Sequence, residues 1–289
     1  MIGQKRTLSF QDPPKINISL KEKELFSILK EVANEKYEGT TLRVAGGWVR
    51  DKILGTKIGM TGTNSSNLKF DIDIALDNCL GIDFARKVKS FLTEKGIETG
   101  GIGIVSKNPE KSKHLETATM HLMGFSVDFV NLRTESYTEN SRIPNMDIGS
   151  PIEDAYRRDL TINTLFYNIN DDSIEDFTGK GLSDLIEGVI RTPLSAMETL
   201  LDDPLRVLRS IRFSSRFGFK MSDELIDACR HPQVHKALSH KVSLERIGTE
   251  IDLMMHAKNP VLAFRLIDQL ELGPIVFSTN ESKRLSPEE

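Results

Sequence analysis

Hydrophobic and polar residues alternate between positions 70 and 76, in the string Phe-Asp-Ile-Asp-Ile-Ala-Leu. A period of two is typical of a β-strand, because successive side chains of a strand point to opposite faces. The pattern predicts a strand that buries its hydrophobic face and presents Asp71 and Asp73 together on the other. Two carboxylates on one rigid face can hold Mg²⁺, but for an isolated D-x-D pair a plain surface strand is the more common explanation.

The spacing of hydrophobic residues predicts further elements on either side of this strand. They are helices over 20–35 and 82–96 and strands over 42–45, 102–105, 115–121 and 125–132. After Pro193 the strand patterns stop, and helical periods continue to about residue 272. We therefore expect an α/β (α+β) domain with a mixed sheet, followed by an all-α domain. The expected ranges are an arm at 1–18, the first domain at 19–192, the second at 193–275 and a polar tail at 276–289.

A glycine pair lies where the strand at 42–45 gives way to a short amphipathic helix. Gly46 and Gly47 allow backbone N–H groups to approach a phosphate closely, and the helix N-terminus adds partial positive charge. Arg50, one turn into the helix, is placed to add a bidentate phosphate contact. A lone Gly-Gly is usually only a turn. Together with the D-x-D strand it predicts one nucleoside triphosphate site.

Composition excludes several classes of protein. The 289 residues carry 38 Lys and Arg against 42 Asp and Glu, so any contact with nucleic acid needs a local basic patch. One candidate patch comprises Arg206, Arg209, Arg212, Arg216 and Lys220. Two distant cysteines indicate neither a disulfide framework nor a zinc site. No apolar run approaches the length of a membrane span. The polar start argues against a secretory signal but leaves an organelle presequence open.

Five motifs in order resemble those of the class II tRNA nucleotidyltransferases and related bacterial poly(A) polymerases, in the polymerase-β-like nucleotidyltransferase superfamily. They are Gly46-Gly47-x-Val49-Arg50-Asp51 with Asp71-x-Asp73; Arg157-Arg158-Asp159-Leu160-Thr161-Ile162-Asn163; Asp176-Phe177-Thr178-Gly179 with Asp184-Leu185; Asp202-Asp203-Pro204-Leu205-Arg206-Val207-Leu208-Arg209; and Ser243-Leu244-Glu245-Arg246-Ile247 with Glu250. The segments at 108–119 and 127–133 are most similar to those of eukaryotic CCA-adding enzymes.

The resemblance implies a nucleotidyltransferase head, a hinge-like segment near 176–185 and a helical neck. In such enzymes an RNA 3′-hydroxyl attacks the α-phosphate of a nucleoside triphosphate, and two Mg²⁺ ions assist. Asp71 and Asp73 are the expected ligands. Asp128 is a weaker third candidate, because an acid at a strand edge explains it as well.

The second motif implies contacts to ribose and phosphates. Asp159 would accept a hydrogen bond from the ribose 2′-hydroxyl, and Arg158 would face the nucleotide. The alternative is that Asp159 only caps an apolar helix beginning at Leu160.

The fourth motif implies base selection without a nucleic-acid template. Cytosine and adenine each present an exocyclic amine beside a ring-nitrogen acceptor, so an Asp and an Arg together select them over uracil and guanine. Asp203 and Arg206, one helical turn apart, have this chemistry. Arg209 and Arg212 would hold the pair or reach the triphosphate. The alternative is that Asp203 is an N-cap before Pro204, unless Asp202 takes that place.

We therefore expect addition of CCA to the 3′ end of tRNA from CTP and ATP, in the cytoplasm or nucleus, with mitochondria also open. An enzyme adding only CC or only A, or a poly(A) polymerase, is the nearest alternative. Family enzymes continue into body and tail domains, so a truncated, non-catalytic fragment that binds tRNA or nucleotide is an alternative of another class. The sequence leaves the oligomeric state open.

Overall fold

The structure, a computed structural model, describes residues 14, 16–55, 70–105, 117–138 and 141–278. The head is built on a seven-stranded sheet of order β3-β4-β5-β2-β1-β8-β9. Only the β2–β5 pair is parallel, so the expected mixed sheet is confirmed. The strands are β1 (Leu42–Ala45), β2 (Phe70–Leu76), β3 (Gly103–Val105), β4 (Thr117–Leu122), β5 (Phe125–Asn131), β8 (Phe166–Asn168) and β9 (Ser173–Glu175).

One face of the sheet is covered by two helices, α1 (Leu20–Lys36) and α3 (Gly81–Glu94). The buried residues Ile72 and Ile74 pair across β2 and β5 with Val127 and Phe129. The ring of Phe129 lies 5.4 Å from that of Phe84 on α3. This face is therefore the core face, and the residues that alternate with it point to the opposite side of the sheet.

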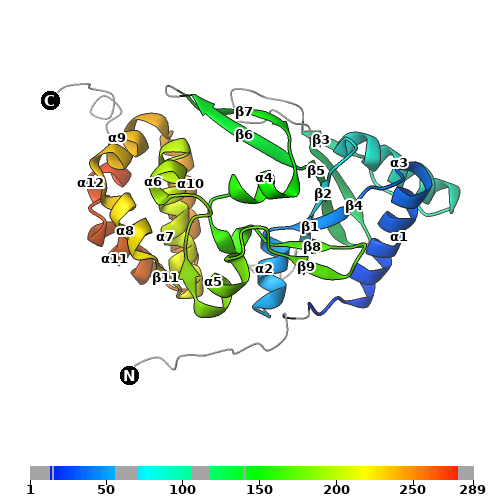
Figure 1. Ribbon diagram of the computed structural model, residues 1–289, viewed down its shortest axis with the longest axis horizontal. Helices are drawn as coiled ribbons and strands as arrows, with labels where there is room; N and C mark the ends of the chain where they lie inside the picture. Colours follow the sequence, from blue (N-terminus) through cyan, green and yellow to red (C-terminus); the bar gives the residue numbers. More distant parts are fainter. Residues whose placement is uncertain (1–13, 15, 56–69, 106–116, 139–140, 279–289) are drawn as a thin grey trace.

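The opposite side carries a smaller hydrophobic cluster that includes Ala75, Leu132, Ala155 and Phe166. Ala155 belongs to α4 (Pro151–Tyr156), whose start is fixed by a capping box between Ser150 and Glu153. A hairpin of β6 (Arg133–Thr138) and β7 (Ser141–Ile148) leads into this helix. Figure 1 shows the hairpin and α4 between the two ends of the molecule.

The prediction of an apolar helix after Asp159 is wrong. Residues Thr161–Asn163 form a single 3₁₀ turn, η2, and the chain then enters β8, which pairs with β1. The hydroxyl of Thr161 donates to Asp184 and that of Thr164 to the carbonyl of Thr161, so side chains replace helical hydrogen bonds here. Pairing with a strand more than a hundred positions away overrides the local pattern.

The second domain packs helices around α7 (Arg206–Phe217). The others are α6 (Ala196–Asp202), α8 (Asp223–Arg230), α9 (Pro232–Lys241), α10 (Leu244–Met255), α11 (Pro260–Gln269) and α12 (Gly273–Val276). A short parallel pair of β10 (Val189–Ile190) with β11 (Lys220–Met221), next to α5 (Gly181–Glu187), is the exception to an all-helical neck.

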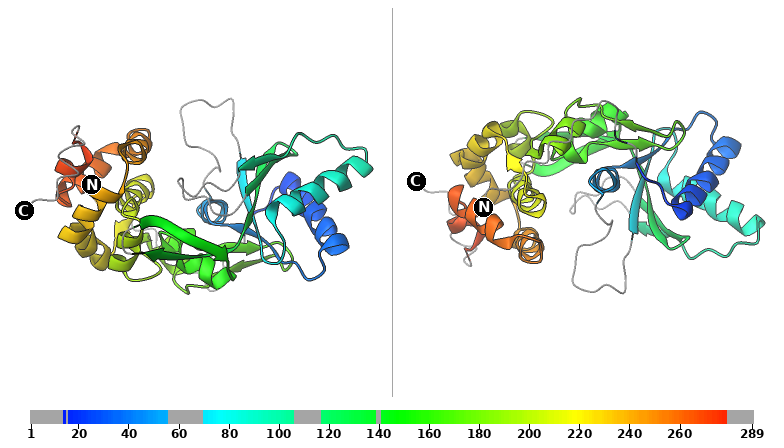
Figure 2. Two further views of the ribbon diagram at one scale, coloured as in Figure 1. Left: turned by 90° about the horizontal axis from the view of Figure 1, so that it is seen from above. Right: turned by 90° about the horizontal axis from the view of Figure 1, so that it is seen from below.

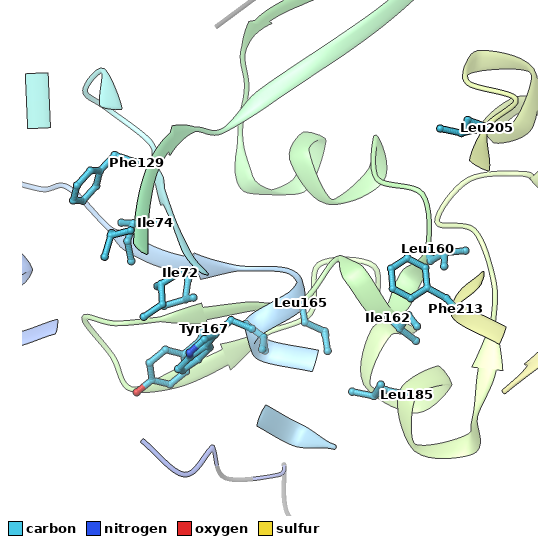
Figure 3. Close-up of a cluster of buried hydrophobic side chains, with 14 of the residues drawn as sticks. Ile72, Ile74, Phe129, Leu160, Ile162, Leu165, Tyr167, Leu185, Leu205 and Phe213 are labelled. Atoms are coloured by element: carbon cyan, nitrogen blue, oxygen red, sulfur yellow. The ribbon is translucent and has the colours of Figure 1, made fainter. Parts of the chain in front are cut away.

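Head and neck lie at the two ends of an elongated molecule (Figure 2). A single cluster of buried hydrophobic side chains nevertheless extends through both. Figure 3 shows part of this cluster, from Ile74 and Phe129 in the sheet, past Leu165, to Leu160. Phe213 of α7 lies next in the cluster, on the neck side. The second motif, which contains Leu160, therefore forms the packed joint between the domains.

Several expected segments lie wholly or partly outside the described residues: most of the arm at 1–18, the start of the segment at 108–119 with the first two residues of the strand at 115–121, and the end of the tail. Within the described part of the chain, no helix is both long and apolar enough to cross a membrane.

Candidate active site

Three aspartates lie on the side of the sheet opposite α1 and α3. Asp71 and Asp73 alternate with the buried isoleucines of β2, and Asp128 of β5 stands directly beside Asp73 in the parallel register. The hydroxyl of Thr119, on the next strand, donates to Asp128 Oδ1 at 2.6 Å and orients that carboxylate. The register thus gives Asp128, the weaker candidate from the sequence, a position equivalent to that of Asp73.

Negative charge is concentrated around Asp73, which has Asp71 and Asp128 as neighbours. Although Asp73 is partly open to solvent, loss of hydration among the surrounding strand atoms raises its pKa to about 6, and the Asp128 carboxylate adds to the rise. The guanidinium of Arg158 opposes the shift. A divalent cation would stabilise the charged form of Asp73, which lost hydration and a neighbouring acid disfavour. As positioned, no group of three acidic, histidine or cysteine side chains converges on one point among the described residues.

Arg158 is held beside the acidic face by a buried carboxylate. Its Nε and Nη2 donate to Asp154 Oδ2 at 3.0 and 2.7 Å, and its Nη1 donates to the carbonyl of Asn163 at 3.0 Å. The guanidinium also lies over the ring of Phe166, 5.0 Å from its centroid. Arg158 is therefore fixed in orientation and close enough to Asp73 to influence its charge.

Gly46 makes room for this arginine rather than presenting its own N–H. Its N–H donates to the carbonyl of Leu165, and its φ is +62°. A Cβ at this position would meet Arg158 Nη1 at 2.6 Å. The glycine is thus required both by its backbone conformation and by the guanidinium above it. Its neighbour Gly47 begins α2 (Gly47–Ile53).

Asp159 links the head to the neck. Its Oδ1 accepts from the N–H of Leu160 and from the Asn163 amide, and its Oδ2 accepts from Arg209 Nε on α7 at 2.7 Å. Burial alone would raise the pKa of Asp159, but Arg209 and Asn163 hold it well below its usual range. The idea that Asp159 only caps a helix is wrong.

Arg50 does not lie where the sequence placed it. The residue is 5% exposed, and its Nε and Nη1 donate to Asp51 Oδ1 and Asn163 Oδ1 at 2.8 and 2.5 Å. Its guanidinium carbon lies 5.0 Å from the ring centroids of both Phe213 and Phe217 on α7. In this arrangement Arg50 packs against the neck instead of facing an incoming phosphate.

Asp203 and Arg206 are not on one helix. Asp203 follows α6 in extended conformation, while α7 begins at Arg206, so the expected helical spacing between them is wrong. The Asp203 carboxylate accepts from the N–H of Leu205 and pairs with Arg246 Nη2 at 2.7 Å. Buried Arg206 donates to the carbonyls of Thr199 and Arg157.

Glu250 contacts two arginines of α7, Arg212 and Arg209. It accepts from Arg212 Nε at 2.6 Å and lies 3.8 Å from Arg209 Nη1. Glu250 was part of a motif with no predicted role, and Asp154 was not predicted as a site residue. The signal for Asp154 was present in the capping box before it and in the arginines three and four positions later.

The predicted residues thus fall into two groups joined by the second motif. Asp71, Asp73, Asp128 and Arg158 lie on the open side of the sheet. The other group lies along α7 and comprises Arg50, Asp159, Arg206, Arg209 and Arg212, with Asp203 at the start of the connection into that helix.

Comparison with known proteins agrees with this architecture. A model of the poly(A) polymerase head domain matches residues 17–191. The mitochondrial CCA tRNA nucleotidyltransferase of Candida glabrata is 45% identical over 274 residues, which cover 91% of this chain and 50% of that protein. The structure of a CCA-adding enzyme in apo form II superposes with a TM-score of 0.71 at 28% identity, over 92% of this chain and 57% of that one. The structure of a CCA-adding enzyme in complex with CTP superposes with a TM-score of 0.68 at 26% identity, over 92% of this chain and 55% of that one.

The chain spans about half the length of the curated relative it matches. The family model covers more than half of the chain itself, and the solved structures share the fold of head and neck. The chain therefore belongs to the family defined by the poly(A) polymerase head domain.

Proposed function

We propose that this chain adds CCA to the 3′ end of tRNA, using CTP and ATP and releasing pyrophosphate. One observation carries the proposal: the parallel register places Asp128 beside Asp73, on the same face of the sheet as Asp71. Family membership adds the reaction class, and the relative from Candida glabrata carries the tRNA nucleotidyltransferase name.

Asp71, Asp73 and Asp128 are the proposed ligands of divalent metal, with Mg²⁺ the ion that suits an oxygen donor set. The bound ion would supply charge stabilisation at the attacking and leaving oxygens. Thr119 keeps the Asp128 carboxylate oriented toward the open face, and Arg158 adds a fixed positive charge beside Asp73. These fixed groups would orient a triphosphate against the sheet.

Base selection is proposed for Asp203 and Arg206, with Arg209 and Arg212 holding the pair or reaching the triphosphate. Asp203 would have to exchange Arg246 for the base amine, and Arg206 would have to release a backbone carbonyl. Asp159 and Glu250 keep Arg209 and Arg212 in place. We expect Asp203→Ala or Arg206→Ala to relax discrimination against UTP and GTP. Full retention of selectivity in both variants would remove this part of the proposal.

Transfer of single nucleotides separates the members of the family. The substrates are tRNA ending before CCA and tRNA ending in CC, each offered labelled CTP alone, ATP alone or both. A CCA-adding enzyme gives two additions with CTP and a third only when ATP is also present. A CC-adding enzyme stops after two. An A-adding enzyme acts only on tRNA already ending in CC, and a poly(A) polymerase extends with ATP alone. No transfer to either tRNA, with tRNA still retained in a filter assay, would identify the chain as a fragment that binds without catalysis.

The compartment is also a proposal. The relative from Candida glabrata is named as mitochondrial, which supports the mitochondrion among the compartments left open by the sequence. Imaging of the tagged chain in cells would test this assignment against a cytoplasmic or nuclear one.

A further inference from the structure

One side of α7 faces the head at regular helical spacing. Positions i, i+4, i+7 and i+8 share one face of a helix, and here they are Arg209, Phe213, Arg216 and Phe217. Their head partners are Asp159 for Arg209, Asp51 for Arg216 and Arg50 for the two rings. The helix is therefore attached to the head along its length rather than at one end.

Arg50 makes the central attachment. The rings of Phe213 and Phe217 are stacked at an interplanar angle of 11°, and the guanidinium lies across both. Its N–H groups point away from the rings, to the carboxylate of Asp51 and the amide of Asn163. A planar guanidinium can present its face to aromatic rings and its edge to acceptors at the same time.

This attachment connects β2, which carries Asp71 and Asp73, to the neck in two steps. β1 pairs directly with β2, with Val44 opposite Ile74, and continues through Gly46 into α2. Arg50 and Asp51 on α2 then contact α7, which carries Arg206, Arg209 and Arg212. A displacement of α7 against α2 would therefore move the proposed base-reading groups relative to the proposed metal ligands.

We propose that Arg50 is a positioning residue that locks α7 against the head and so sets base discrimination without touching the nucleotide. This inference rests on the proposed function, because it requires the neck to select the base. A misplacement of about 1 Å between bound groups costs as much as a hundredfold in rate. Loss of the contact between Arg50 and the two rings of α7 should therefore affect the choice of base more than the requirement for metal.

Two substitutions separate this role from a phosphate contact. Arg50→Lys keeps a positive charge that attracts phosphate but cannot lie flat across two rings while donating to two acceptors. Phe217→Leu removes one ring from the neck and leaves every head residue intact. Phe264→Leu is the matched control, because that half-buried ring on α11 stacks on Phe277.

The measurement is the ratio of kcat/KM for CTP to that for UTP on tRNA ending before CCA, with thermal unfolding recorded for each protein. We expect both Arg50→Lys and Phe217→Leu to lower the ratio by about tenfold or more, the double variant to add little, and Phe264→Leu to keep it. The Mg²⁺ dependence should stay the same in all of them.

Retention of the wild-type ratio by folded Arg50→Lys and Phe217→Leu would overturn the inference and leave the proposed function standing. A uniform rise of KM for all four nucleotides in Arg50→Lys, with Phe217→Leu unaffected, would also overturn it in favour of a phosphate contact. If Arg50→Lys does not fold, Phe217→Leu alone decides. Absence of transfer by the wild-type chain would instead refute the proposed function.

Discussion

At the scale of single residues, buried or partly buried carboxylates hold most of the arginine side chains of the site in place. Asp128 stands beside Asp73, Asp154 holds two arginines of the second motif, and Asp159 and Glu250 hold those of α7. Asp154, Asp159 and Glu250 each fix at least one guanidinium, either beside the aspartates of the sheet or in the neck. The positive charge of the site is thus local, although the whole chain carries a formal charge of −4.

Replacement of Asp128 by Asn should reduce nucleotide transfer by about ten- to a hundredfold, because it removes one proposed metal ligand and leaves the strand intact. The measurement is the single-turnover rate of CMP transfer at saturating Mg²⁺. Ser126→Ala, two positions earlier on the same face, removes no carboxylate and should stay close to the wild-type rate. Equal rates in the wild type and Asp128→Asn would mean that Asp128 is only a strand acid.

Asp154 should contribute to stability through its charge. Burial would raise its pKa, but the guanidinium groups of Arg158 and Arg157 lower it to about 2, against an ordinary value of 3.8. Because the folded-state pKa is the lower one, the contribution is complete above pH 3.8 and is lost as the pH falls toward 2. The shift corresponds to about 2–3 kcal/mol.

Chemical denaturation at several pH values tests this contribution. The difference in unfolding free energy between the wild type and Asp154→Asn should be about 2–3 kcal/mol at pH 6 and shrink between pH 4 and 2. The exposed Asp227→Asn serves as the control and should show little difference at any pH. A difference for Asp154→Asn that does not change with pH would refute the charge-based account.

At the scale of elements, the sequence predicted what local periodicity determines. β2 was predictable because its alternation of hydrophobic residues with aspartates is uninterrupted, and α1 because its hydrophobic residues keep helical spacing. β8 was not, because its three residues are all buried and show no alternation. The position of Arg50 was also hidden, since its acceptor Asn163 lies 113 positions away.

Gly46→Ala tests the junction between β1 and α2. Gly46 has a φ of +62° and a ψ of −112°, a conformation that residues with a Cβ rarely adopt, so the substitution combines backbone strain of about 1–3 kcal/mol with a contact to the Arg158 guanidinium. Gly55→Ala is a matched control, because Gly55 has a φ of +64° but open space around its Cβ. Gly46→Ala should therefore be destabilised more than Gly55→Ala in denaturation, and only Gly46→Ala should lose transfer activity. Equal effects of the two substitutions would show that the contact with Arg158 does not matter.

At the scale of the whole molecule, the shared hydrophobic core predicts that head and neck unfold together. Trp48 is the only tryptophan, is buried in the head, and reports on that domain by fluorescence, while far-UV circular dichroism also follows the neck helices. Leu208→Ala on α7 should cost about 2–5 kcal/mol and shift both signals equally. Two separate transitions, with Trp48 unaffected by Leu208→Ala, would contradict a continuous core.

The division of labour between the two ends of the molecule is the central claim. The sheet of the head carries the acidic face that would hold the metal, and the neck carries the groups proposed to choose the base. The sequence could predict the composition of both groups from its motifs, but the register of β5 and the attachment of α7 depend on contacts between distant segments.

The most direct test compares the wild type with Asp73→Asn in the transfer of labelled CTP to tRNA ending before CCA, in the presence of Mg²⁺. The wild type should produce labelled tRNA, and Asp73→Asn should lose transfer by a factor of about a thousand while still binding tRNA in a filter assay. Transfer by Asp73→Asn at the wild-type rate, or no transfer by the wild type at high tRNA concentration, would contradict the account.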